Sequence, residues 1–150
     1  MDIADVDADG FSDLVLASPG MSMQGHDHCG GAWLLYGDAV LPEVVELDAP
    51  DLRHVIMHGQ GDVWRYYGSD VTMGDLDGDG RADIVLTNDN AHVLDEDYSE
   101  VLVVYGSSVI GDTIDLVADT SITVVTGEDV SSKFGTALGV FNWSADGVGD

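Results

Sequence analysis

The chain has 150 residues, of which 29 are acidic and four are basic, so its formal net charge at pH 7 is −25. Nucleic acids and anionic membrane surfaces repel such a chain, which excludes them as expected partners. No apolar run is long enough for insertion into a membrane, and the single cysteine, Cys29, excludes an internal disulfide.

The first predicted element is an acidic loop at residues 5–13, with carboxylates at loop positions 1, 3, 5 and 9. Two like charges about 4 Å apart repel by about 1 kcal/mol even in water, so four converging carboxylates favour a bound cation. Calcium accepts about six to eight oxygen ligands, whereas magnesium prefers to keep much of its own water. The predicted calcium ligands are the side chains of Asp5, Asp7, Asp9 and Asp13 and, by analogy with other calcium loops, the backbone carbonyl of Phe11.

The next segment, 18–30, is expected to connect two strands and contains His26, His28 and Cys29 within four residues. These residue types bind zinc or copper, but a structural site would require a further ligand that the sequence does not identify. The alternative is an exposed loop without a metal role.

The acidic pattern returns 70 residues after Asp5, at residues 75–83. The corresponding predicted calcium ligands are Asp75, Asp77, Asp79, Asp83 and the carbonyl of Arg81. An EF-hand would need an acidic residue at loop position 12, where the two copies have Leu16 and Leu86. Each loop is therefore predicted to lead into a strand.

Around the second loop, short apolar runs rich in Val, Ile, Leu and Tyr predict strands near 69–74, 82–87, 100–105 and 122–126. No segment has convincing helical periodicity. The segment 88–99 is expected to be a long loop between the second and third of these strands.

A degraded third copy of the loop occupies residues 142–150. Carboxylates are missing at two of its ligand positions, so its site is expected to be weaker or empty; the corresponding residues are Asn142, Ser144, Asp146, Val148 and Asp150. For the two complete copies the simpler alternative is a pair of solvated acidic turns, because Asp and Gly are common turn residues.

Elements flanking the loops repeat in step with them. Tyr67-Gly68 corresponds to Phe134-Gly135, and residues 33–37 correspond to 102–106, which end in Tyr-Gly in both copies. Four strands in each repeat of about 70 residues predict an all-β fold made of β-propeller blades, each a four-stranded antiparallel sheet. The predicted division is a first blade at 1–59 that lacks its start, a complete blade at 60–126 and the start of a third at 127–150.

Together, the Tyr-Gly or Phe-Gly element, the Asp-x-Asp-x-Asp-Gly-x-x-Asp loop and the strand Gly31-Ala32-Trp33-Leu34-Leu35-Tyr36-Gly37 resemble the FG-GAP repeats of integrin alpha-chain propellers and of many secreted bacterial proteins. The resemblance implies calcium in the loop between the first two strands of a blade. It also implies a secreted or cell-surface location and a role in adhesion or recognition.

This organisation predicts a fragment of a longer propeller, whose missing blades would cover its open faces. The calcium loops and the segments 18–30 and 88–99 are expected at opposite faces, so a protein or glycan ligand would bind opposite the calcium. No catalytic motif with recognisable spacing is present in the sequence, so this segment is not expected to be an enzyme. The alternative is a non-catalytic accessory propeller of a secreted hydrolase or lyase.

Overall fold

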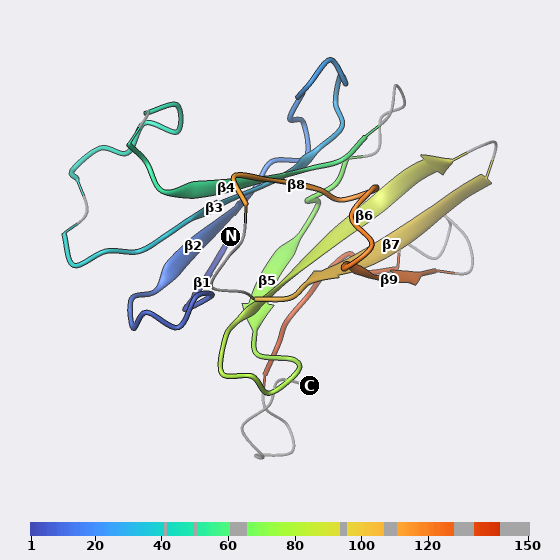
Figure 1. Ribbon diagram of the computed structural model, residues 1–150. Coiled ribbons are helices and arrows are strands. Elements are labelled where there is room, and N and C mark those ends of the chain that lie inside the picture. Colours follow the sequence, from blue (N-terminus) through green and yellow to red (C-terminus); the bar gives the residue numbers. More distant parts are fainter. Residues whose placement is uncertain are drawn as a thin grey trace.

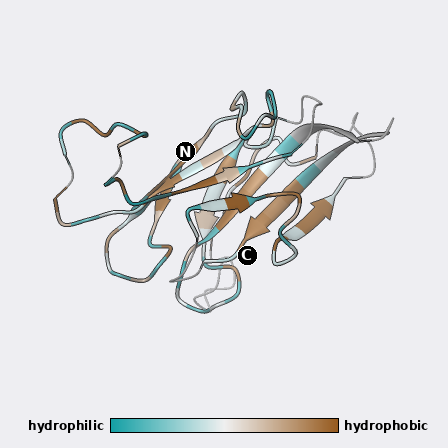
Figure 2. Ribbon diagram, turned by 45° about the horizontal axis from the view of Figure 1, so that its top comes forward, coloured by the Kyte–Doolittle hydropathy of each residue, from teal (hydrophilic) through white to brown (hydrophobic). Residues whose placement is uncertain are grey.

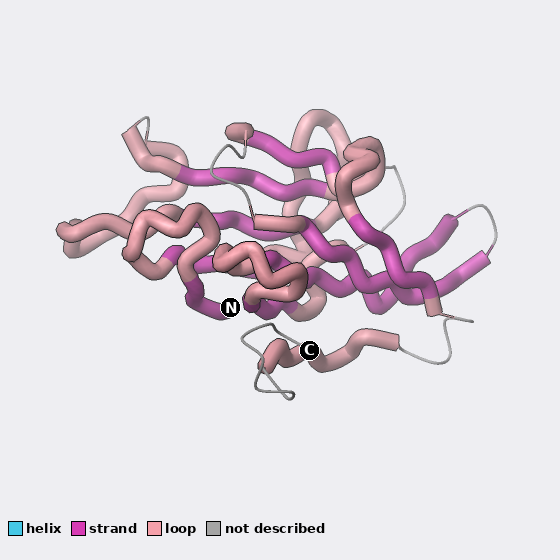
Figure 3. Tube along the Cα trace, turned by 60° about the horizontal axis from the view of Figure 1, so that its bottom comes forward, coloured by secondary structure: helices cyan, strands magenta, loops and turns pink. Residues whose placement is uncertain are grey.

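The computed structural model describes residues 1–40, 42–49, 51–60, 66–93, 96–106, 111–127 and 134–141, without the side chains of 89–93 and 96–98. The described residues form strands and loops and no helix, as Figure 3 shows. In this part of the chain there is accordingly no helix of the length and apolar character needed to cross a membrane.

The first sheet contains five strands in the order β1-β2-β3-β4-β8 (Figure 1). Its members are β1 (Asp2–Ala4), β2 (Asp13–Ala17), β3 (Gly31–Leu35), β4 (His54–His58) and β8 (Thr113–Asp115). The first four strands pair antiparallel, as predicted for a blade. β8 was not predicted: it comes from the connection after β7 and joins the edge of the sheet parallel to β4, pairing Met57 with Ile114.

The second sheet has the predicted four antiparallel strands in the order β5-β6-β7-β9. They are β5 (Val71–Gly74), β6 (Asp83–Val93), β7 (Glu96–Val104) and β9 (Thr123–Thr126). The expected loop at 88–99 is wrong in part, because β6 and β7 extend through residues 88–93 and 96–99 as a paired hairpin. A bulge between Asn88 and Ala91 lets the pairing continue past the point where the apolar pattern ends.

One apolar core joins the two sheets, since β5 packs against β1 and β2. Its largest buried side chains include Leu34 and Met57 from the first sheet and Ile84, Leu86 and Leu102 from the second. Figure 2 shows apolar residues concentrated on the strands. The two antiparallel-rich sheets, packed on one core, are β-propeller blades, and the fold class is confirmed apart from the added strand β8.

The repeated aromatic-glycine element has a packing role. A Cβ on Gly68 would lie 2.2 Å from the carbonyl oxygen of Gly31 in the first sheet, and one on Gly135 would lie 2.8 Å from the side chain of Val101 in the second. Both glycines also have positive φ, +84° and +77°. Each therefore lets the chain leaving one sheet pass close against that sheet before the next strand begins.

The predicted division at 1–59, 60–126 and 127–150 stays a prediction. The strand β8 lies within the second of these segments but pairs with the first sheet. The third acidic loop, including Asn142, Ser144, Asp146, Val148 and Asp150, lies outside the described residues.

Candidate metal centres

The two complete acidic loops occupy equivalent places in the two sheets. The first connects β1 to β2 and the second connects β5 to β6, as predicted. In Figure 1 these connections lie at one end of the sheets, whereas the segment between β2 and β3 and the far ends of β6 and β7 lie at the other.

In each loop three of the four predicted carboxylates come together. Asp5, Asp7 and Asp13 offer oxygens that all lie within 4.8 Å of one another, and so do Asp75, Asp77 and Asp83. Calcium binds oxygen at about 2.3–2.6 Å, so ligands on opposite sides of one ion lie about 4.6–5.2 Å apart. Both clusters therefore fit a calcium ion in donor chemistry and in spacing.

Backbone N–H groups hold the first carboxylate of each loop. Gly10 donates to Asp5 at 2.9 Å and Gly80 donates to Asp75 at 2.9 Å, closing each loop around its own carboxylate. The two glycines have φ of +91° and +86°, a conformation that side chains disfavour. The glycine in the motif thus allows the turn that aims the carboxylate inward.

The last carboxylate of each loop is fully buried and joins the loop to its sheet. Asp13 accepts hydrogen bonds from Val6 N–H at 2.7 Å and from Gly37 N–H at 2.8 Å. Asp83 accepts the equivalent bonds from Leu76 and Gly106, each at 2.8 Å. Burial raises the pKa of both carboxyl groups; the hydrogen bonds oppose this shift, and the neighbouring carboxylates add to it. A nearby cation would therefore help to keep both carboxyl groups ionised.

Gly37 and Gly106 also belong to the two candidate sites, although the sequence pattern did not single them out. A Cβ on Gly37 would lie 2.3 Å from the carbonyl oxygen of Ser12, and one on Gly106 would lie 2.5 Å from that of Ala82. Both follow a tyrosine at the end of a third strand, and the repetition of Tyr-Gly was the available signal.

The carboxylates at loop position 5 are placed differently from the other three. Asp9 accepts the N–H of Phe11 at 2.9 Å, and Asp79 accepts that of Arg81 at 2.8 Å, so each stabilises the turn. Neither belongs to the three-residue clusters. That Asp9 and Asp79 bind calcium stays a prediction, and so does calcium binding by the carbonyls of Phe11 and Arg81.

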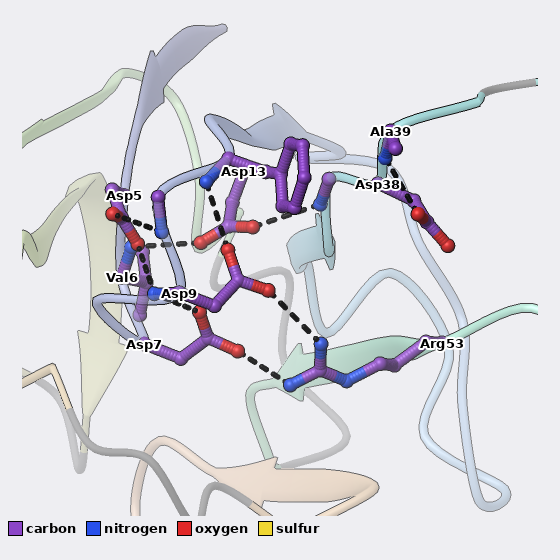
Figure 4. A network of polar contacts seen from close by, with 11 residues as sticks. Asp5, Val6, Asp7, Asp9, Asp13, Asp38, Ala39 and Arg53 are labelled. Carbon is purple, nitrogen blue, oxygen red and sulfur yellow. Dashed lines mark hydrogen bonds and ion pairs between the residues drawn. The ribbon is translucent and has the colours of Figure 1, made fainter.

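An arginine side chain lies against the carboxylates of the first loop (Figure 4). Arg53 precedes β4, and its guanidinium pairs with the carboxylate of Asp7 and lies 3.6 Å from that of Asp9. It also lies 4.1 Å from the ring centroid of Tyr36. The bond to Asp7 is the main reason that the pKa of Arg53 is raised.

The suggested transition-metal ligands do not form such a cluster. Among the described residues, His26, His28 and Cys29 do not form a group with metal-binding spacing. Cys29 is buried, and its thiol donates to the carbonyl of Met21 at 3.4 Å. A packing role accounts for the cysteine.

Comparison with known proteins agrees with the repeat found in the fold. Residues 67–105, which run from Tyr67 through the second loop to Tyr105, match the model of the FG-GAP repeat family. The chain therefore contains an FG-GAP repeat, and the predicted resemblance is confirmed.

Three curated relatives share one name, phosphatidylinositol-glycan-specific phospholipase D. The chain is 36% identical to the protein of Homo sapiens over 86 residues, 57% of this chain and 10% of the relative. For Bos taurus the identity is 38% over 87 residues, again 57% and 10%. For Rattus norvegicus it is 30% over 83 residues, 55% and 10%. The matched region thus spans about a tenth of the length of each relative.

Proposed function

We propose that this chain is a calcium-binding β-propeller segment in which calcium is structural, and that it serves as a non-catalytic accessory part of a secreted hydrolase. The observation that supports calcium most strongly is the duplicated cluster of three carboxylates, built on the same connection in two sheets. An isolated solvated turn would not require the same burial and backbone bonding of Asp13 and Asp83.

The accessory role is supported by the relatives, which are named as phospholipases D. Adhesion or recognition is the other function expected from the family resemblance, and the relatives favour the hydrolase setting over it. Loops on a rigid scaffold commonly carry recognition, so a protein or glycan contact at the end opposite the calcium loops stays a prediction. A secreted or cell-surface location is part of the same proposal.

When bound, calcium would supply positive charge to the three carboxylates of a loop and fix the connection between two strands. Asp13 and Asp83 would tie that connection to the third strand through Gly37 and Gly106. At ten times its dissociation constant, one calcium ion stabilises the folded state by about 1.4 kcal/mol.

Thermal unfolding of chelator-treated protein tests the structural role. Calcium is expected to raise the midpoint, and equimolar magnesium is expected to raise it less, because magnesium gives up its water reluctantly. An equal effect of both ions would indicate general screening of the −25 charge instead of specific sites.

A direct assay tests the non-catalytic part. The calcium-loaded chain is expected to release nothing from a phosphatidylinositol-glycan substrate. Turnover that is lost on changing a carboxylate outside the two loops, with calcium binding intact, would contradict the accessory role.

A further inference from the structure

The two loops are alike in their carboxylates but differ in their charge balance. In the first loop Asp7 has a side chain only 5% exposed, and it pairs with Arg53, whose side chain is 57% exposed. In the second loop the arginine, Arg81, lies 3.4 Å from Asp79, outside the cluster. Among the described residues, Asp77 takes part in no ion pair.

The position of Arg53 is set by the sheet. Its backbone carbonyl accepts the N–H of Tyr36 at 3.1 Å, directly after the pairing of Leu35 with His54. This bond places the start of the side chain beside the loop, and the Tyr36 ring lies under the guanidinium at 4.1 Å. The ion pair is therefore built on two strands and a cation–π contact.

The same position in the second sheet lacks a charge. In the first sheet Leu34 pairs with Val55, and continuing this register by two residues puts Arg53 opposite Tyr36. In the second sheet Val103 pairs with Thr123, and the same continuation puts Ser121 opposite Tyr105. Ser121 turns back on its own segment and donates to Asp119 at 2.7 Å. The two sheets thus have an arginine and a serine at corresponding positions of the strand register.

We propose that Arg53 is a built-in counter-ion of the first loop: it stabilises that loop without metal and competes with calcium for Asp7, so the second loop is the tighter calcium site. This inference rests on the proposed calcium function. For calcium to use Asp7 fully, the guanidinium must withdraw from it, and the ion pair is lost. A cation left near the site would also repel calcium.

Amide NMR on the whole chain resolves the two sites, because the amides of Gly10 and Gly80 each donate to the first carboxylate of their own loop. In a titration of chelator-treated protein with calcium chloride, the Gly80 signal is expected to reach its midpoint at lower calcium than Gly10. In Arg53→Ser the Gly10 midpoint is expected to fall by about threefold to tenfold, the range for losing an ion pair of this exposure together with its repulsion. The Gly80 midpoint is expected to move less than the Gly10 midpoint.

Three further variants separate the contribution of Arg53 from general charge. Arg53→Lys keeps the positive charge and is expected to leave the Gly10 midpoint near that of the unaltered chain. Arg81→Ser removes the same charge elsewhere and is expected to leave Gly10 unchanged. Ser121→Arg is expected to move the Gly80 midpoint to higher calcium. A Gly10 midpoint that does not fall in Arg53→Ser, while Gly80 titrates normally, overturns the competition.

Hydrogen exchange without metal distinguishes this proposal from the calcium function itself. As a counter-ion, Arg53 protects the first loop, so Arg53→Ser is expected to speed exchange at Gly10 more than at Gly80. If neither glycine responds to calcium in any variant, the calcium function fails and the counter-ion role is decided by this measurement. Unchanged exchange at Gly10 overturns that role.

Discussion

At the residue scale, two glycines outside the acidic motif complete it. Gly37 and Gly106 give their N–H groups to the buried carboxylates of Asp13 and Asp83 and leave no room for a Cβ. They connect each loop, which carries the proposed calcium ligands, to the end of the third strand.

Gly106→Ala is expected to lower the free energy of unfolding by about 1–3 kcal/mol, because the added methyl meets a backbone oxygen that cannot move freely. It is also expected to weaken calcium binding at the second loop. Chemical denaturation measures the first effect. Gly20→Ala is the matched control, since nothing lies within 4 Å of its Cβ position and it is expected to have little effect. Equal stability of the two variants would contradict the role of Gly106.

The buried carboxylates also predict a pH dependence. The folded chain raises the pKa of Asp13 and Asp83 above the ordinary 3.8, chiefly by burial, so it binds their protons more tightly than the unfolded chain does. These two groups therefore destabilise the metal-free fold when ionised, and that cost is relieved as pH falls through their folded pKa values toward 3.8.

With calcium bound, the pH dependence of stability has the opposite sign, because the ligands of calcium must be ionised and protons compete with the ion. The difference in unfolding midpoint with and without calcium is expected to shrink steadily from pH 7 toward pH 4. Thermal unfolding at a series of pH values, each with calcium or chelator, measures it. A difference that stays constant over this range would contradict calcium binding by these carboxylates.

At the element scale, a carboxylate on the first strand of one sheet is hydrogen-bonded to the first strand of the next sheet. Asp2 on β1 accepts the N–H of Met73 and the hydroxyl of Thr72, both at 2.9 Å, on β5. Asp70, just before β5, accepts the N–H of Leu138 at 2.9 Å in the following segment. An aspartate beside a first strand thus bonds the backbone of the segment that follows its sheet in both cases.

Asp2→Ala is expected to destabilise the fold by about 1–3 kcal/mol, since it leaves the N–H of Met73 without its acceptor. Denaturant unfolding measures the loss. Asp48→Ala removes an equal charge from an exposed site and serves as the control. If both variants lose the same small amount, the bond between the sheets is not important for stability.

The sequence predicted the elements that depend on local pattern. Two acidic loops, the strands after them and the second sheet all follow from short motifs and apolar runs. It missed β8, because a parallel pairing of Met57 with Ile114 spans more than 50 residues and leaves no local pattern. It also missed Arg53, whose partners Asp7 and Tyr36 are distant in sequence and adjacent only after β3 and β4 pair.

At the scale of the whole molecule, the two acidic loops are in contact with each other. The N–H of Ala82, next to Asp83, donates to the carbonyl of Asp5 at 2.9 Å. Val6 lies fully buried between Asp5 and Asp7, in the core shared by both sheets. Ordering one loop therefore constrains the backbone of the other, which couples the sites through structure.

Neutralising the first site is expected to weaken the second through this contact. In Asp7→Asn, which leaves the second loop unaltered, the calcium affinity reported by Gly80 is expected to fall by a few-fold, the lower end of ordinary coupling between sites. An affinity equal to that of the unaltered chain would show that the loops act independently.

Isothermal titration calorimetry of calcium into the chelator-treated chain measures whether the two acidic loops bind calcium. Two saturable sites are expected in the described part of the chain; Asp7→Ala is expected to abolish the weaker site and Asp77→Ala the tighter one. Absence of saturable binding, or binding that both variants leave intact, would contradict this expectation and identify the clusters as solvated acidic turns.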